Sequence, residues 1–204
     1  MFARLAVGEN PPADASVTVV PAPSGARAVV VGGTAWHVVA ADVDPDWVAA
    51  EVAHDPIAAP LGARFLAGLA DRVAAEPGSL DAVLVAPRTG RPLDLVAVDD
   101  LDHPRVQRAL HHRRDVRVWT TPDGAGLVTV GRGVAGRWET SLEVDPAARC
   151  RGLGTALAAA APALVPDGAP LWAQVAPANV ASLRAFLAAG YRPVCAEVLL
   201  PPRQ

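Results

Sequence analysis

Residues 149–155 read Arg149-Cys150-Arg151-Gly152-Leu153-Gly154-Thr155. A segment with strand character, residues 140–144, leads through an Asp145-Pro146 turn into this stretch, and an Ala- and Leu-rich segment with helical character follows it. Glycines let an anion approach the backbone, and the free N–H groups of a first helical turn point at it along the positive end of the helix dipole. The stretch therefore predicts an anion site between a strand and a helix, and we expect the anion to be a pyrophosphate.

A second block follows at residues 179–191, Asn-Val-Ala-Ser-Leu-Arg-Ala-Phe-Leu-Ala-Ala-Gly-Tyr. The first block resembles the Arg/Gln-x-x-Gly-x-Gly/Ala motif with which the Gcn5-related N-acetyltransferases (GNAT family) bind acetyl-CoA. The second resembles the family's fourth-helix signature, Asn-x-x-Ala/Ser-x-x-x-Tyr-x-x-x-Gly-Phe/Tyr. Both blocks stand in the family's order and spacing, and the resemblance covers about residues 94–200.

The resemblance implies the acyl-CoA N-acyltransferase fold, a mixed α/β fold whose mostly antiparallel central sheet is flanked by helices. Residues 93–204 would form the acetyl-CoA-binding domain. Residues 1–92 lie outside the resemblance, and we expect them to form an N-terminal α/β extension or subdomain. The implied activity is transfer of acetyl from acetyl-CoA to a primary amine by direct attack in a ternary complex.

The resemblance also implies which residues contact the cofactor. Backbone N–H groups from Cys150 to Thr155 would hold the pyrophosphate, and backbone groups of Leu142 and Val144 would pair with the pantetheine arm. Arginines beside the glycines suit phosphate oxygens. Asn179 is expected to contact the cofactor and to cap a helix, whereas Gly190 reads as a helix C-terminal residue. The expected cofactor-binding residues are Leu142, Val144, Arg149, Cys150, Arg151, Gly152, Leu153, Gly154, Thr155, Asn179, Ser182 and Phe186.

The catalytic groups depart from the family pattern. Phe186 stands where relatives usually place a Tyr that protonates the departing thiolate. Ser182, Tyr191 or water could substitute, or the protein could bind CoA without catalysis. For the general base the candidates are Glu143 and Glu139, with Glu143 preferred because it lies nearer the expected acetyl group. Both alternate onto the strand face opposite Val144 unless a bulge intervenes.

Composition limits the remaining classes. The 204 residues are 51% hydrophobic and 4% aromatic. No apolar run approaches the roughly 20 residues that span a bilayer, and the N-terminus lacks a signal-peptide pattern. Cys150 and Cys195 have no Cys or His partners at metal-ligand spacing, so we expect no metal and a reducing compartment. A cytoplasmic protein without a membrane contact is predicted.

Two phosphate-binding alternatives are disfavoured. All 18 basic residues are arginine, so the Lys that a P-loop requires is missing. Residues 131–136 match Gly-x-Gly-x-x-Gly, but an alternating strand follows instead of a helix, so we interpret them as a hairpin turn. A nucleotide-binding protein of unrelated fold remains as an alternative that depends on the glycine turns alone.

Charge is distributed unevenly along the chain. Residues 1–102 hold 14 acidic residues and 6 arginines, whereas residues 103–204 hold 7 acidic residues and 12 arginines. The half with the expected phosphate loop is therefore the basic half, which would attract a polyanion such as CoA. No aromatic and basic interleaving indicates nucleic acid. The sequence leaves open the amine acceptor, a homodimer, and the alternative of a non-catalytic CoA-binding sensor or interaction module.

The pattern of apolar residues predicts the elements. Strands are expected at 17–20, 28–31, 36–40, 82–86, 93–98, 116–120, 127–130, 138–144, 171–175 and 195–200. Helices are expected at 47–54, from Phe65 up to Pro77-Gly78, at 103–114, at 155–165 and from Asn179. Pro162 should kink or end its helix early. His111 and His112 read as the solvated end of the basic helix, and Cys150 as a loop residue rather than a nucleophile.

Overall fold

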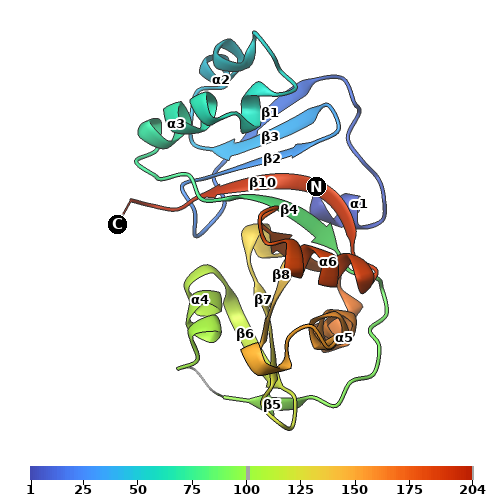
Figure 1. Cartoon of the computed structure of the whole chain (residues 1–204). Coiled ribbons are helices and arrows are strands. Elements are labelled where there is room, and N and C mark those ends of the chain that lie inside the picture. Colours follow the sequence, from blue (N-terminus) through green and yellow to red (C-terminus); the bar gives the residue numbers. More distant parts are fainter. Residues whose placement is uncertain (100–101, 204) are drawn as a thin grey trace. The chain divides into compact units, whose positions relative to one another are not determined.

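A computed structural model describes residues 1–99 and 102–203. The chain forms two compact units (Figure 1). Unit 1 comprises Met1, residues 3–83 and the C-terminal residues from Val194. Unit 2 comprises Phe2 and residues 84–193, and it contains both sequence blocks quoted above. The C-terminal strand thus packs with the N-terminal residues.

Unit 1 contains a five-stranded arrangement in the order β1-β3-β2-β10-β4. β2 pairs antiparallel with β3 and with β10, and β1 pairs parallel with β3. Its elements are α1 (Phe2–Ala6), β1 (Ser16–Val20), β2 (Ala28–Gly33), β3 (Trp36–Ala41), α2 (Pro45–Val52), the 3-10 turn Ala59–Leu61, α3 (Ala63–Arg72), β4 (Leu80–Val85) and β10 (Arg192–Leu200).

The core of unit 1 lies between its strands and its two longer helices. Val30 and Val39 are fully buried against Val48 of α2 and Leu69 of α3. Both helices therefore cover the same face of the strands, as Figure 1 shows. α2 begins where expected, because Asp44 accepts a hydrogen bond from the Asp46 N–H and Pro45 occupies the first helical position.

Unit 2 contains the strands β9-β8-β7-β6-β5 in that order. β5 to β8 form an antiparallel meander, and β8 pairs parallel with β9. Its elements are β5 (Val96–Val98), α4 (Pro104–His112), β6 (Arg114–Thr120), β7 (Gly126–Arg132), β8 (Trp138–Val144), α5 (Leu153–Ala160), β9 (Leu171–Val175), α6 (Val180–Ala188) and 3-10 turns at Val134–Gly136, Pro146–Ala148, Ala161–Leu164 and Pro166–Gly168.

Helices cover both faces of the unit 2 strands. Leu157 of α5 packs with Val128 and Trp138 on one face. Val106 of α4 packs with Val118 and Leu127 on the other. Figure 1 shows α4 and α5 on opposite sides of β6, β7 and β8. One face of β8 therefore looks toward α5 and the other toward α4.

The predicted fold class is confirmed: both units combine helices with mostly antiparallel strands. Residues 131 and 132 end β7, and residues 133–136 form the predicted turn, which leads into β8 and not into an α-helix. The helix that begins at Leu153 ends at Ala160 and continues as a 3-10 turn through Pro162, as the proline predicts. The domain boundary at residues 92 and 93 stays a prediction. Among the described residues, no helix has the length and apolar character to cross a membrane.

His37 of β3 is a buried polar residue in unit 1. It is 3% exposed, and its Nδ1 atom has no hydrogen-bond partner among the described residues. The ring packs against Gly32, where an added Cβ would approach it to 2.6 Å. Burial lowers the pKa of His37 below its ordinary value because the charged form loses its hydration.

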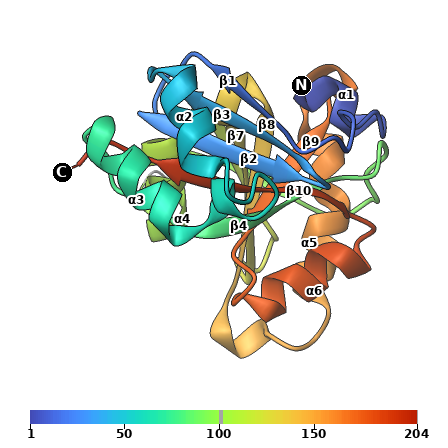
Figure 2. The same ribbon diagram turned by 90° about the horizontal axis from the view of Figure 1, so that it is seen from above.

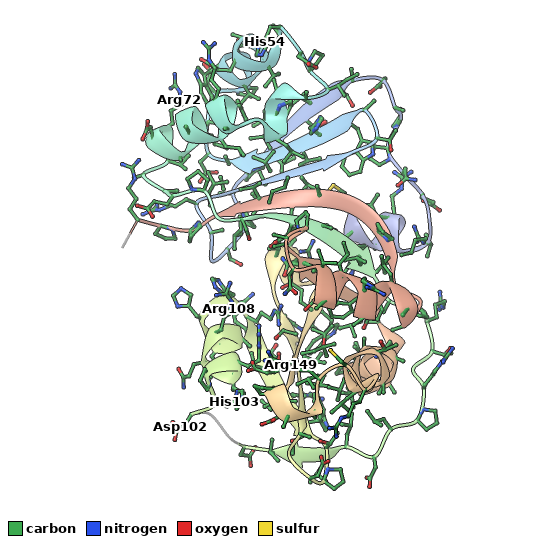
Figure 3. The ribbon with its side chains drawn as sticks, in the orientation of Figure 1. His54, Arg72, Asp102, His103, Arg108 and Arg149 are labelled. Atoms are coloured by element: carbon green, nitrogen blue, oxygen red, sulfur yellow. The ribbon has the colours of Figure 1, made fainter. Side chains whose placement is uncertain are left out.

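We expect His37 to make unit 1 sensitive to acid. The folded-state pKa lies below the unfolded one, so protonation favours the unfolded state, and stability falls as the pH drops below about 6.5. Urea unfolding at pH 7.5 and 5.5 measures this difference. His37→Gln should reduce it, whereas the control His54→Gln, at an exposed residue (Figure 3), should not. Equal acid sensitivity in wild type and His37→Gln would contradict the assignment.

Candidate functional site

β8 and β9 separate shortly after they meet. In the described residues their pairing consists of Trp138 with Leu171 and Glu139 with Trp172. β8 continues to Val144, and β9 to Val175. The second half of β8 therefore pairs with β7 on one side, and no described residue of β9 pairs with it on the other side. This free edge is where an extended ligand could pair with the backbone.

The hydrogen-bond alternation of β8 shows which residues use that edge. The Asp145 N–H donates to the Ala125 carbonyl at 2.8 Å, so Val144 and Gly126 form a non-hydrogen-bonded pair. Such pairs alternate along an antiparallel ladder. The N–H and C=O groups of Leu142 and Val144 thus point away from β7, toward β9. These are the two residues whose backbone was expected to pair with the pantetheine arm.

The glycine loop leads directly from this edge into α5. Gly152 precedes the helix with φ of 85°, a left-handed conformation that favours glycine, and Cys150 has φ of 61°. The loop residues from Arg149 to Gly152 are exposed. The N–H groups of the first turn of α5 have no acceptor within the helix. An exposed glycine loop thus leads into a helix start at the position where the sequence predicts an anion site, and anion binding there stays a prediction.

The two sequence blocks meet at Gly154. A Cβ added there would lie 3.7 Å from Val144 Cγ2 and 3.8 Å from the Cβ of Ala185. The end of β8, the first turn of α5 and the middle of α6 are therefore neighbours, and Figure 2 shows α5 and α6 side by side. Glycine at this position keeps the three backbones close while leaving the helix start open.

α6 has the caps that the sequence predicts. The Asn179 side chain accepts a hydrogen bond from the Ser182 N–H at 3.2 Å. At the other end Gly190 has φ of 91°, and the Tyr191 N–H donates to the Phe186 carbonyl, which together make a Schellman motif. Asn179 thus caps the helix, while its predicted cofactor contact stays a prediction.

Neither Phe186 of α6 nor Tyr191, which follows the helix, offers a ready proton donor. Phe186 is 4% exposed, and its ring packs edge-on against Tyr191 with centroids 4.8 Å apart. The Tyr191 hydroxyl is buried and has no hydrogen-bond partner among the described residues. Burial raises the pKa of Tyr191 above its usual value of 10. Ser182, at the start of the helix, is half-buried.

Arg149 contacts the free edge of β8. Its Nε donates to the Val144 carbonyl at 3.1 Å. This contact confirms that the Val144 carbonyl points away from β7. Figure 3 shows Arg149 in the loop between β8 and α5. The side chain thus connects the strand edge with the predicted phosphate loop.

Both candidate bases lie on the face of β8 opposite Val144. The β7–β8 register runs without interruption, so no bulge switches them. The bulge lies instead in β6, between Arg114 and Arg117, where Asp115 has φ of 52°. Glu143 forms an ion pair with Arg105 of α4 at 2.9 Å, and both side chains are about one-third exposed. Glu143 is therefore accessible, and its oxygens lie toward α4.

Glu139 forms part of a buried charged cluster. Its Oε2 accepts from Arg113 Nε at 3.0 Å, and its Oε1 accepts from Arg137 Nε at 2.8 Å and from the Val134 N–H. The three charged side chains are 10% exposed or less. Arg113 also donates to Ser141 Oγ. These contacts connect α4, the β7–β8 turn and β8.

Sequence analysis missed the three arginines that bind the two glutamates. Arg105 and Arg113 fall in the segment interpreted as a basic helix, and Arg137 lies between the predicted turn and the predicted strand without an assigned role. A periodicity signal was present, since Arg105, Val106, Ala109 and Arg113 share one side of α4. Its identification as a partner surface for β8 required the tertiary structure. Among the described residues, no group of three His, Cys, Asp or Glu side chains is arranged to hold a metal ion.

Comparisons with known proteins give structural matches alone. No protein-family profile and no curated protein matches the sequence. A GCN5-related N-acetyltransferase from Kribbella flavida is similar over 91% of this chain and 90% of its own, with 15% identity and a TM-score of 0.47. A GNAT-family putative acetyltransferase from Novosphingobium aromaticivorans covers 64% and 69%, with 18% identity and a TM-score of 0.45. A GNAT-family acetyltransferase from Colwellia psychrerythraea covers 72% and 63%, with 12% identity and a TM-score of 0.45.

We expect Glu139 to be required for stability. Glu139→Gln removes the carboxylate that two buried arginines bind, and breaking comparable buried pairs costs about 3–5 kcal/mol. Urea unfolding followed by circular dichroism measures the free energy of unfolding. As a control, Asp115→Asn removes an exposed ion pair with Arg132 and should cost less than about 1 kcal/mol. Equal losses in both variants would show that the buried cluster is not stabilising.

Proposed function

We propose that this protein is an N-acetyltransferase that transfers acetyl from acetyl-CoA to a primary amine. The observation that carries the proposal is the free edge of β8 at Leu142 and Val144, which continues into the glycine loop and the start of α5. A pantetheine arm is extended and has amide groups, so it can pair with a strand edge. A pyrophosphate suits the N–H groups of the loop. The resemblance of both sequence blocks points to the same ligand.

The proposed cofactor residues follow from this placement. Leu142 and Val144 would bind the pantetheine arm, and the residues from Cys150 to Thr155 the pyrophosphate. Arg149 and Arg151 would contact phosphate oxygens, which requires the Arg149 side chain to leave the Val144 carbonyl. Asn179, Ser182 and Phe186 would border the cofactor from α6. Asn179 already serves as a helix cap.

The proposed reaction is direct attack. The amine nitrogen bonds to the acetyl carbonyl carbon, the C–S bond breaks, and the CoA thiolate leaves and takes up a proton. Holding the amine and the thioester in line can supply about 7–11 kcal/mol of the barrier reduction. The Val144 N–H would polarise the thioester carbonyl. Glu143 would accept the proton of the amine, either directly or through a water molecule.

Glu143 is the better of the two candidate bases. It is accessible, whereas Glu139 is 2% exposed and both of its oxygens accept hydrogen bonds. Glu139 would then act through the position of Arg113 and not on the amine. The structure leaves Glu143 hydrogen-bonded to one arginine, so its other oxygen could face the acceptor.

A second candidate function is binding of CoA without catalysis, as a sensor or interaction module. Phe186 favours it, because this buried side chain has no proton to donate to a thiolate. The Tyr191 hydroxyl does not offer a replacement in this geometry, since it is buried and its pKa is raised. A thiolate is nevertheless a tolerable leaving group, and water could protonate it. Measured turnover separates the two functions.

We expect the Gly154 substitutions to separate binding from folding. Asp fits sterically, because the added Cβ meets its neighbours at ordinary contact distances, but its charge repels a pyrophosphate at the helix start. Calorimetric titration with acetyl-CoA should show an affinity at least about tenfold weaker for Gly154→Asp than for Gly154→Ala. The melting temperatures of the two variants should agree closely. Unchanged affinity in Gly154→Asp would remove the loop from the cofactor site.

We expect Glu143→Gln to lower kcat/KM for an amine substrate by about 10²–10⁴, the usual contribution of a general base. Acetyl-CoA affinity should stay unchanged, because the Glu143 side chain lies on the strand face opposite the α5 side. Thiol release measured across a panel of amines gives the rate. Arg105→Gln serves as the control that breaks the same ion pair while keeping the carboxylate. Full activity in Glu143→Gln would assign proton removal to another group.

A further inference from the structure

α4 lies along β8 with its basic side facing that strand. Arg105, in the first turn, pairs with Glu143 near the end of β8, and Arg113, after the last turn, pairs with Glu139 near its start. The helix therefore runs antiparallel to β8. The same stretch of β8 has its free edge on the β9 side. A molecule that reaches the acetyl group at this edge from the Glu143 side would pass α4.

Among the described ion pairs that connect α4, the β7–β8 turn and β8, arginines outnumber carboxylates. Glu139 and Glu143 bind Arg113, Arg137 and Arg105. Arg108 is exposed and forms no ion pair among the described residues (Figure 3). It follows Arg105 by three residues, so both lie on adjoining parts of the helix surface. His112 follows Arg108 by four residues and therefore lies beside it on the helix surface.

The electrostatic environment of His112 reflects this excess. Partial burial is the main cause that lowers its pKa, and the positive charges of His111, Arg108 and Arg113 lower it further, while Glu139 opposes them. Arg108 and Arg113 are thus close enough to act on the ring. This part of the α4 surface includes Arg108, which forms no ion pair with the residues that the structure describes.

We propose that the acceptor of this protein is a small amine that carries an anionic group, a carboxylate or a phosphate, and that Arg108 binds this group. The inference rests on the proposed acetyltransferase function and names the substrate class of the same site. A guanidinium binds either anion through two parallel hydrogen bonds. The amine of the bound molecule would then lie toward Glu143. Arg108 determines specificity in this arrangement and takes no part in bond making.

The charge excess also suits the chemistry of the amine. Positive neighbours disfavour an ammonium ion and favour the neutral amine, which is the nucleophilic form. A polyamine or a lysine-rich peptide would instead be repelled by Arg108, whose charge is not offset by an ion pair among the described residues. The anionic group compensates that repulsion in the acceptor we propose. The substrates in the test distinguish whether this anionic group is a carboxylate or a phosphate.

The test uses the whole protein, acetyl-CoA and pairs of amines that differ in the anionic group. The pairs are glycine and glycinamide, β-alanine and its amide, aspartate and asparagine, and phosphoethanolamine and ethanolamine, with spermidine as a cationic amine. Thiol release gives kcat and KM. The variants are Arg108→Gln and the control Arg117→Gln, an exposed arginine of β6 on the opposite face, in register with Val130. Calorimetry gives the acetyl-CoA affinity of each protein.

We expect the anionic member of at least one pair to exceed its neutral partner roughly tenfold to a hundredfold in kcat/KM. Arg108→Gln should remove this preference, mainly through KM, while acetyl-CoA affinity and the rate with the neutral partner stay unchanged. Arg117→Gln should keep the preference. The amino acid and phosphate pairs show which anion is recognised.

Three results would overturn the inference. Neutral amines or spermidine could be preferred, Arg108→Gln could keep the anionic preference, or Arg108→Gln could weaken acetyl-CoA binding and so assign the arginine to the cofactor. Turnover without an anionic preference would leave the acetyltransferase proposal standing. Acetyl-CoA binding with no turnover of any amine would overturn both the inference and catalysis, and would favour the CoA-binding module. Absence of acetyl-CoA binding would overturn the proposed cofactor site itself.

Discussion

The separation of β8 from β9 is the constraint on which the site depends. Two residue pairs connect these strands at their start. Among the described residues, Leu142 and Val144 of β8 then have no paired residue in β9. Backbone N–H and C=O groups in a sheet interior are normally paired, so a free edge inside a layered unit is available for a ligand. The glycine loop lies at the end of this edge, which brings amide-pairing groups and anion-binding groups onto one path. Neither half alone would define an elongated ligand with a phosphate at one end.

The two faces of β8 have different tasks. The face with Trp138 and Leu142 packs on α5 and orients the helix start. The opposite face binds α4 through carboxylate–arginine contacts, some of them buried. Breaking a buried pair leaves an uncompensated charge, which is costly, so such contacts hold α4 in a defined register along the strand. That register places Arg108 and Glu143 on the same side of the unit.

Motif spacing and apolar periodicity predicted the element order of unit 2, the turn at residues 131–136, the end of α5 near Pro162 and both caps of α6. These are local features, since a proline, a glycine at positive φ or an Asn cap acts within a few residues. The alternation along β8 also predicted that Glu139 and Glu143 lie opposite Val144. From the sequence a bulge was considered only in the strand that became β8. The structure has a bulge in β6 instead, where Asp115 adopts a positive φ and no glycine in the sequence indicates it.

The sequence by itself determined the position of the glycine loop before α5, the order of strands and helices, and the strand face of the two candidate glutamates, because each is a property of neighbouring residues. Only the tertiary structure decided that Glu139 is buried against Arg113 while Glu143 stays accessible beside Arg105, since these arginines lie 26 and 38 residues away along the chain. It also decided that β10 packs with β2 in unit 1, because strand pairing between residues near 30 and 198 has no local signature. The free edge of β8 is of the same kind: it exists because β9 diverges, and no stretch of residues encodes that angle.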